Sequence, residues 1–329
     1  MTFRLTAGVT LLLLIAPMAQ ALDVGRPDVE SFIDTMVDQY DYDRETLRDI
    51  LGEAEKKQSV LDAISRPAEK TLNWAEYRKI FLTRERVNAG AAFWRANREE
   101  LEDIERRTGV PVEMLVGIIG VETYYGRITG GYRVLDALAT LAFYYPPRSK
   151  FFRSELEQFL LLVREEGMDP EDAVGSYAGA MGRPQFMPSS FRAYAVDSTG
   201  DGKRDIWNNW EDVAGSIANY FNAHGWRTGE EVTTRATIGE RWSGPFPKNI
   251  LKATGTIDSL SDQGVMFATG LPGDAAAQLL TLEGEGGTEH WVGFHNFFVI
   301  TRYNRSVMYA LAVHQLGQEI ALAVRGDGS

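Results

Sequence analysis

One stretch, VEMLVGIIGVETYYGRITGG at residues 112–131, restricts the fold more than any other part of the sequence. Between residues 112 and 125 its large side chains recur at the three- and four-residue spacing of one helix face. A helix buries such an apolar face, so we expect Glu122 to point inward near the C-terminal end of a core helix. Desolvation raises the pKa of a carboxyl group, the property that a general acid needs near neutral pH. The residues of this face are Leu115, Ile118, Ile119, Glu122 and Tyr125.

The same pattern also fits a structural glutamate that an arginine or backbone N–H groups hold in the core. Other features of the chain restrict the classes of function that it can have. The formal net charge is -12 and there is no basic cluster, which excludes nucleic acid and anionic membranes as bulk partners. The absence of cysteine excludes disulfides, a thiol nucleophile and Cys-ligated metals. With 329 residues, 44% of them hydrophobic, the chain can form two or three domains.

The N-terminus has the pattern of a secretory signal peptide over residues 1–21. Arg4 precedes an apolar run at residues 5–18, and Ala19, Gln20 and Ala21 form an A-x-A site with predicted cleavage after Ala21. The apolar run is too short to favour a transmembrane helix. Since no cysteine can be acylated at the cleavage site, we expect a soluble exported protein without a membrane anchor.

The remaining chain is mainly α, with a smaller β component (an α+β protein). Residues 22–107 have amphipathic helical patterns, which predict a helical support domain. Residues 108–226 form helical runs separated by Gly and Pro, and residues 227–290 have short strand and turn patterns that predict a small β-rich domain. We expect residues 291–329 to complete the helical domain and to pack beside the cleft.

Residues 108–226 also combine Gly-rich turns with aromatic side chains. Gly126, Gly130, Gly131 and the segment GSYAGAMG at 175–182 allow close approach of the backbone to a ligand. Aromatic rings stack on sugar faces, so this region is a candidate glycan cleft, although aromatic residues alone are more typical of a core. They are Tyr124, Tyr125, Tyr132, Tyr144, Tyr145, Tyr177 and Phe186.

Several long motifs in this order resemble the B-type lytic murein transglycosylases, which cleave bacterial peptidoglycan. They are GVETYYGRITGGYRVLDALATLAFYYPPRSKFF, SYAGAMGRPQFMPSSFRAYAVDSTGDGKRDIW, SIANYFNAHGW and ITRYNRSVMYALAV. The resemblance covers most of residues 113–226 and part of the C-terminal region. It implies a lysozyme-like catalytic core in which Glu122 is the single acid and base. It also implies binding of peptidoglycan glycan strands by Ser176, Gln185, Phe186, Tyr220, Tyr303 and Tyr309, with Tyr77 as a further candidate.

The resemblance also suggests a location and a reaction. Membrane-bound members carry a lipid-anchoring cysteine that this sequence lacks, so we expect a soluble periplasmic form. Most glycoside hydrolases need two carboxylates, and spacing places neither Glu113 nor Asp136 beside Glu122. In the family's chemistry, one Glu protonates the glycosidic oxygen. The same Glu then takes the proton of the C6 hydroxyl of N-acetylmuramic acid, so that a 1,6-anhydro ring closes.

The segment DSTGDGKRD at 197–205 resembles an EF-hand calcium loop. Asp197, Thr199, Asp201 and the backbone carbonyl of Lys203 would be ligands. Position 12 is Asn208 rather than Glu, so a longer loop would take its last carboxylate from Glu211 or Asp212. The ion would be structural Ca²⁺, with Na⁺ as an alternative, and the chemistry would need no cofactor. An Asp-Gly turn without a metal fits the same residues.

Two other functions fit parts of the sequence. A goose-type lysozyme-like hydrolase would use Glu122 as acid together with a positioned water and a second carboxylate. A non-catalytic peptidoglycan-binding scaffold would keep the aromatic cleft without needing a buried acid. No motif identifies a protein partner.

Overall fold

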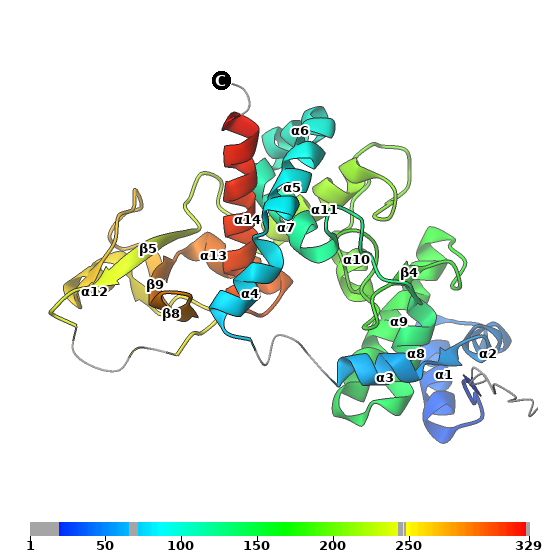
Figure 1. Ribbon diagram of the computed structural model, residues 1–329. Coiled ribbons are helices and arrows are strands. Elements are labelled where there is room, and N and C mark those ends of the chain that lie inside the picture. The colour runs from blue at the N-terminus through cyan, green and yellow to red at the C-terminus, as the bar shows by residue number, and fades with distance from the viewer. Residues whose placement is uncertain (1–19, 66–71, 243–245, 247, 327–329) are drawn as a thin grey trace, which may run out of the picture.

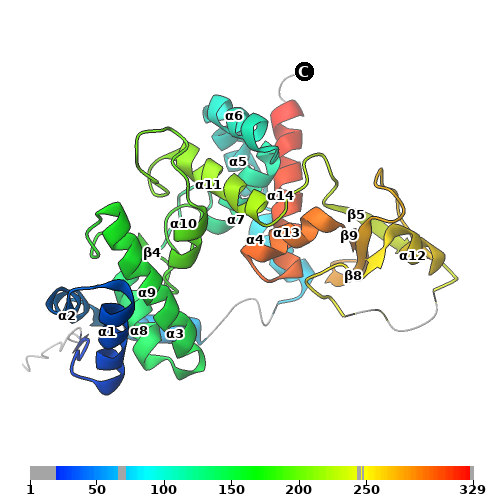
Figure 2. The same cartoon turned by 180° about the vertical axis from the view of Figure 1, so that it is seen from behind.

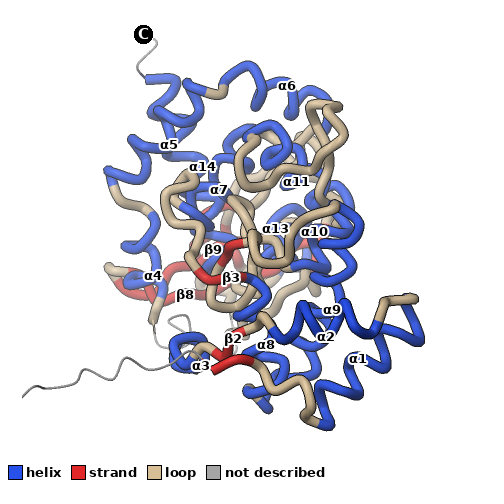
Figure 3. Tube along the Cα trace, turned by 90° about the vertical axis from the view of Figure 1, so that its right-hand side faces the viewer, coloured by secondary structure: helices blue, strands red, loops and turns tan. Residues whose placement is uncertain are grey.

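The computed structural model describes residues 20–65, 72–242, 246 and 248–326. Figure 1 shows three parts side by side: a sheet with α12 at one end, helices around α7 and α14 in the middle, and α1–α3 with α8 and α9 at the other end. Helices make up most of the chain, and Figure 3 shows the strands confined to the sheet and a few short pairs. The predicted fold class, mainly α with a small β part, is confirmed.

The N-terminal helices pack on a helix pair from the middle of the sequence. Glu55 N–H donates to the Asp136 carboxylate over 2.8 Å, and Lys57 N–H donates to the Thr140 hydroxyl over 2.9 Å. These bonds attach the N-terminal helices to α8. The elements of this part are β1 (Gln20–Ala21), α1 (Pro27–Tyr40), α2 (Arg44–Gly52), β2 (Glu55–Lys56), α3 (Gln58–Ile64), α8 (Val134–Tyr144) and α9 (Ser149–Glu166).

The central part surrounds α7, whose residues are apolar on every side, so that the helix is buried all round. Glycines allow α14 to approach it closely. A Cβ on Gly117 would lie 2.6 Å from the Val313 carbonyl oxygen, and one on Gly317 would lie 2.2 Å from that of Glu113. The helices here are α4 (Trp74–Phe81), α5 (Arg84–Ala96), α6 (Arg98–Thr108), α7 (Val112–Thr123), α11 (Trp210–Ala223), α13 (His295–Tyr303) and α14 (Val307–Gly326).

The third part is an antiparallel five-stranded sheet in the order β6-β8-β9-β5-β7, with a small hydrophobic core of its own. It lies where the short strand patterns of residues 227–290 predict it. Its elements are β5 (Thr233–Ile238), β6 (Gly255–Thr256), α12 (Ile257–Asp262), β7 (Val265–Met266), β8 (Ala276–Gly284) and β9 (Gly287–Gly293). The remaining short elements are β3 (Tyr132–Arg133), a 3-10 helix (Pro146–Arg148), β4 (Val174–Gly175) and α10 (Pro188–Tyr194).

The predicted domain boundaries stay a prediction, but the packing groups the helices differently from the sequence. Residues 22–107 contribute α1–α3 to the part around α8 and α9, and α4–α6 to the part around α7 and α14. Helix α14 is the one described helix that is long and apolar enough to span a membrane. Of its most apolar window 56% is buried against the protein, as a core helix requires.

The predicted signal peptide lies mostly outside the described residues, which begin at Gln20. Gln20 and Ala21 pair with Lys56 and Glu55 in a short antiparallel ladder. Leu22 is buried, and its N–H donates to the Ala54 carbonyl over 2.8 Å. Cleavage after Ala21 would therefore leave Leu22 as an anchored first residue.

Candidate active site

A tight turn ends α7 immediately after Glu122 and Thr123. Tyr124, Tyr125 and Gly126 all have left-handed backbone, with φ of 50°, 59° and 79°. Non-glycine residues adopt this conformation at a cost, and such turns concentrate at functional sites. The Thr123 hydroxyl supports the turn by accepting the Gly126 N–H over 3.2 Å and donating to the Arg183 carbonyl over 3.1 Å. Glu122 thus lies in the last turn of a helix whose end is fixed on two sides.

Glu122 is half-buried, less enclosed than the apolar spacing predicts, because the last turn of α7 reaches the edge of the core. Its carboxylate accepts a hydrogen bond of 2.5 Å from the hydroxyl of Tyr309, a buried residue in the first turn of α14. Burial, together with the charge of Glu122, raises the pKa of Tyr309 well above its ordinary value. Tyr309 therefore stays protonated and remains a donor to Glu122.

Arg86 of α5 is a residue near this site that the sequence interpretation missed. Its guanidinium donates to the Gly120 carbonyl over 2.6 Å and lies 4.5 Å from the centre of the Tyr124 ring. Tyr125 returns a hydrogen bond of 3.1 Å to the Arg86 carbonyl. A cation at the C-terminal end of a helix stabilises the helix dipole, and this one also holds the turn after Glu122. No motif marks an arginine at this position.

Gln185 and Ser176 lie in the segment of residues 174–186, which pairs with itself through Gly175, Met181 and Phe186. Gln185 has a left-handed φ of 54°, and its amide donates to the carbonyls of Thr129 and Gly182. The Ser176 hydroxyl accepts the N–H groups of Ala178 and Ala180. Both predicted glycan ligands therefore also hold the segment together.

The predicted aromatic ligands form one cluster. The Phe186 ring lies 5.8 Å from the Tyr220 ring and 5.7 Å from the Tyr303 ring, measured between ring centres. The hydroxyls of Tyr220 and Tyr303 each donate over 2.7 Å to backbone carbonyls, those of Arg302 and Pro184. We call Phe186, Tyr220 and Tyr303 the aromatic wall.

The charge of Glu122 also acts on the half-buried Tyr303, where it and burial raise the pKa of the hydroxyl. Tyr77 of α4 is buried, and it lies close enough to Tyr309 to contribute to the raised pKa of the Tyr309 hydroxyl. The structure thus brings Glu122 together with tyrosines from α4, α13 and α14.

The two acidic residues nearest to Glu122 in sequence have other places. Asp136 is 1% exposed, and it binds the Arg133 guanidinium and the Glu55 N–H. Glu113 lies in the first turn of α7, nine residues from Glu122, about 13 Å away along the helix axis. Neither carboxylate stands beside Glu122, in agreement with the spacing argument.

The EF-hand-like loop is held by carboxylates that accept its own N–H groups. Asp197 accepts from Gly200 and Gly202 over 2.6 and 2.7 Å, and Asp201 accepts from Lys203 over 2.9 Å. Thr199 donates to Asp197 over 3.2 Å. Such a loop carries hard oxygen donors of the kind that Ca²⁺ prefers.

The two alternatives for the last ligand have different surroundings. Asp212 is fully buried, and its oxygens accept the N–H groups of Ser198 and Asp205, which tie both ends of the loop to α11. Glu211 forms an ion pair with Arg107 over 3.2 Å. Among the residues that the structure describes, no three His, Asp or Glu side chains are arranged to hold a metal ion.

The family model described as "Transglycosylase SLT domain" matches residues 25–318. The chain is 42% identical over 324 residues to the membrane-bound lytic murein transglycosylase B of Escherichia coli (strain K12), covering 94% of this chain and 88% of that protein.

Solved structures give the same result. The catenated lytic transglycosylase SltB1 of Pseudomonas aeruginosa superposes with a TM-score of 0.87 at 49% identity, over 91% of this chain and 99% of that chain. For the E. coli lytic transglycosylase Slt35 in complex with calcium, the TM-score is 0.83 at 43% identity, over 94% and 97%. For P. aeruginosa SltB3 in complex with NAG-anhNAM-pentapeptide, it is 0.75 at 30% identity, over 89% and 78%.

Proposed function

The chain belongs to the transglycosylase SLT family and is a lytic murein transglycosylase that cleaves peptidoglycan, and we propose that Glu122 is its single catalytic acid and base. The observation that supports this role most directly is the hydrogen bond from buried Tyr309 to the half-buried Glu122 carboxylate. A fixed donor on the carboxylate orients the carboxyl group for proton transfer.

In the proposed reaction, protonated Glu122 donates its proton to the oxygen between N-acetylmuramic acid and N-acetylglucosamine. The bond from C1 to that oxygen breaks, and the N-acetyl oxygen of the substrate stabilises the positive charge at C1. The Glu122 carboxylate then takes the proton of the C6 hydroxyl, and the C6 oxygen forms a bond to C1. One proton leaves Glu122 and one returns to it, and no water is consumed.

The surroundings of Glu122 favour this reaction over hydrolysis. A hydrolase of the common type needs a second carboxylate about 5–10 Å from the first. Asp136 is occupied by Arg133 in the contact with β2, and Glu113 lies at the opposite end of α7. Both acids nearest in sequence therefore lack the position for that role.

Glu122→Gln tests the assignment, with Glu113→Gln as a matched control on the same helix. We expect turnover of purified murein to fall by ~10²–10⁴-fold or more in Glu122→Gln, because glutamine cannot transfer a proton. Glu113→Gln keeps near-normal turnover. Mass spectrometry of wild-type products should show muropeptides one water lighter than those with reducing ends. Products with reducing N-acetylmuramic ends would instead establish a hydrolase.

For substrate binding, we propose that glycan strands lie against the aromatic wall and contact Ser176 and Gln185, with Tyr77 and Tyr309 beside Glu122. These residues come from the segment at 174–186 and from α4, α11, α13 and α14. The SltB3 complex with NAG-anhNAM-pentapeptide supports glycan strands carrying peptides as the class of ligand. Murein binding should therefore survive in Glu122→Gln, which leaves all these contacts intact.

We also propose that the loop at 197–205 binds a structural Ca²⁺ through Asp197, Thr199, Asp201 and the Lys203 carbonyl. The calcium complex of Slt35, 43% identical to this chain, supports the proposal. Glu211 or Asp212 would join the ligands only after leaving Arg107 or the backbone groups of the loop ends. Calcium should raise the melting temperature, and Asp201→Ala should remove that increase. An unchanged melting temperature on chelation would leave the loop as a turn.

We propose the periplasm as the location, on the signal-peptide pattern at residues 1–21. The E. coli relative is called membrane-bound, whereas this chain has no cysteine for a lipid anchor. Cell fractionation should find the chain, shortened at its N-terminus, in the soluble periplasmic fraction. Recovery of the full-length chain from the inner membrane would contradict this location.

A further inference from the structure

Two adjoining cavities lie behind the aromatic wall, and the end of α11, α13 and residues 251–253 line them. Figure 2 shows α11 and α13 in the middle part of the molecule, seen from behind. They share His224, Leu251 and Arg302 as lining residues. Their volumes of about 250 and 220 Å³ suit a small group rather than a long ligand. Five basic side chains line them: His224, Lys252, His295, Arg302 and Arg305.

This basic pocket is unusual in a protein of net charge -12. Among the described residues, no Asp or Glu lines either cavity. Within the same part of the chain, the side chains of Lys252, Arg302 and Arg305 form no ion pair, whereas arginines such as Arg133 and Arg192 bind carboxylates. Lys252, Arg302 and Arg305 are exposed, so water and salt screen their mutual repulsion, and a bound anion would remove what remains of it.

Both histidines are already oriented. His224 Nδ1 lies 2.7 Å from the Tyr220 carbonyl, and His295 Nε2 lies 2.7 Å from the Gly225 carbonyl. A carbonyl oxygen only accepts, so each ring donates through that nitrogen. In the neutral ring the second nitrogen only accepts, so each histidine donates to an anion through that nitrogen once the ring is protonated. Fixed rings lose little entropy when a ligand binds, which favours a specific site over a diffuse charged surface.

The remaining lining residues are small or apolar: Leu251, Ala253, Ala276, Phe298, Val299 and Thr301. A ligand that matches both features carries a carboxylate next to a small aliphatic group. We propose that the basic pocket binds the C-terminal carboxylate of a peptide that ends in alanine, as a stem on a neighbouring glycan strand would present it. The choice of a murein peptide rests on the proposed function, whereas the carboxylate chemistry rests on the pocket alone.

The pocket also contacts the back of the aromatic wall. The His224 ring stacks on Tyr220 with centres 4.1 Å apart and an angle of 23°. The centre of the Tyr220 ring in turn lies 4.9 Å from that of Tyr303, and the Tyr220 hydroxyl donates to the Arg302 carbonyl. A ligand on Arg302 and His224 therefore acts on two residues that are bonded to the wall.

The test measures binding of D-Ala-D-Ala with a free carboxylate and of the same dipeptide with a C-terminal amide, by calorimetry on the full mature chain. In Glu122→Gln protein we expect the acid to bind at least ~10-fold more tightly than the amide, with an affinity that falls as salt rises. Arg302→Gln combined with Arg305→Gln should weaken binding of the acid at least ~10-fold. Arg241→Gln, which changes an exposed arginine in the sheet domain, serves as the control.

The outcomes separate the two proposals. Equal affinity for acid and amide, or an equal loss in Arg241→Gln, overturns the carboxylate site. Binding of inorganic phosphate or acetate as tightly as the acid dipeptide overturns the alanine peptide and leaves a general anion site. Loss of peptide binding with intact release of anhydro products sinks only this inference. Intact peptide binding in an enzyme whose products have reducing ends sinks only the proposed reaction. Equal melting temperatures of the variants exclude misfolding as the cause.

Discussion

Helix α14 forms two contacts of opposite character. Against α7, Gly117 and Gly317 let the two backbones approach so closely that an added Cβ would meet a carbonyl oxygen at 2.6 and 2.2 Å. On another side α14 borders a cavity of about 400 Å³ that Arg78, Arg235 and Trp291 help to line. The buried Nδ1 of His314 and Oε1 of Gln315 face no hydrogen-bond partner in the described part of the chain.

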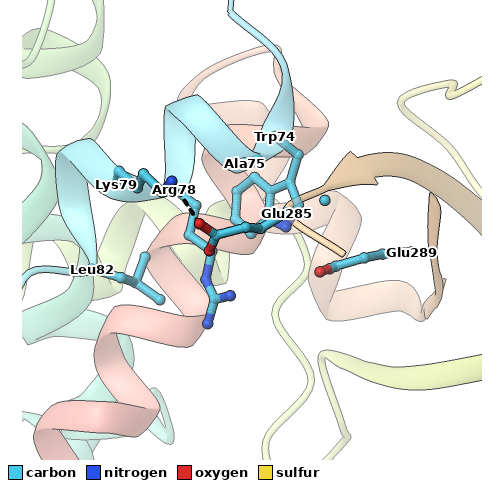
Figure 4. A pocket seen from close by; sticks show the side chains of 8 residues that line it. Trp74, Ala75, Arg78, Lys79, Leu82, Glu285 and Glu289 are labelled. Atoms are coloured by element: carbon cyan, nitrogen blue, oxygen red, sulfur yellow. Dashed lines mark hydrogen bonds and ion pairs between the residues drawn. The ribbon is translucent and has the colours of Figure 1, made fainter. Parts of the chain in front are cut away.

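The junction between α4 and the hairpin of β8 and β9 continues this open side. Figure 4 shows Lys79 of α4 reaching Glu285, with Arg78 beside them and Glu289 on the other side of the pocket. The bond drawn there, between Lys79 and Glu285 over 2.9 Å, joins two exposed side chains. Glu122 and Tyr309 lie on α7 and α14, the closely packed helix pair, whose backbone contacts fix the separation of the two residues. The comparison suggests that precise chemistry needs the tight contact, while the sheet domain needs only a loose attachment.

The largest effect should come from closing the glycine contact. Gly317→Ala places a Cβ against the Glu113 carbonyl, which is backbone and cannot turn away, so α14 must shift. We expect a loss of about 3 kcal/mol in unfolding free energy, with turnover reduced because Tyr309 moves with the helix. Denaturant unfolding and a murein assay measure both. Gly326→Ala is the control on the same helix, since its Cβ would meet nothing within 4 Å. Equal stability of the two variants would mean that the pair is not tight.

The second prediction concerns the side of α14 that borders the cavity, and the pH dependence of stability tests it. Burial lowers the pKa of His314 to about 4, from an ordinary value of 6.5. Above pH 6.5 the His314 ring is neutral in both the folded and the unfolded chain, so its protonation does not lower the free energy of unfolding. As pH falls, the unfolded chain takes up the proton and the folded chain does not, so folding loses about 2 kcal/mol at pH 5. Urea unfolding at pH 7 and pH 5 should show this loss in the wild type and not in His314→Gln. An identical pH dependence in both would show that the cavity solvates the ring.

The third prediction concerns the tight side itself. Tyr309→Phe removes the donor to Glu122 and should lower turnover about 10-fold, with about 1 kcal/mol of stability lost. Tyr42→Phe is the matched control, because its hydroxyl is also buried and donates to the Leu160 carbonyl, far along the chain from Glu122. We expect a similar stability loss there and unchanged turnover. A pH profile of turnover in Tyr309→Phe should shift, since the bond to Glu122 favours the carboxylate.

The sequence predicted the helix that carries Glu122 but not what holds it. Apolar spacing over 112–125 predicted a helix that the structure ends at Thr123. Because α7 is buried all round, spacing alone could not tell which face meets α14, and it overestimated the burial of Glu122. Gly117 and Gly317 carry no side chain, so a hydrophobic pattern cannot identify them. Their missing Cβ is what lets the two helices approach each other.

The sequence also did not reveal the hydrogen-bond partners of polar side chains. Arg86 binds a backbone carbonyl, and any residue type supplies one, so no motif identifies it. The pattern at 197–212 showed acidic residues but not whether each faces an ion or an N–H group. In the structure, the Asp212 carboxylate accepts backbone N–H groups at both ends of the loop. The motifs around Glu122 were long enough to identify the family, which pattern arguments on single residues did not achieve.

The smallest effect should appear at the hairpin junction. Lys79 and Glu285 are 65% and 75% exposed, so water and salt screen their attraction, and holding two long side chains together costs entropy. We expect Lys79→Ala, Glu285→Ala and the double variant to melt at nearly the wild-type temperature, with no coupling beyond the error of the measurement. Lys57→Ala is a useful contrast, because Lys57 lies 3.5 Å from the buried Asp136. If the junction pair showed a coupling as large as the loss in Gly317→Ala, the sheet domain would be fixed as firmly as α7 and α14. The contrast between a tight catalytic pair and a loose attachment would then be wrong.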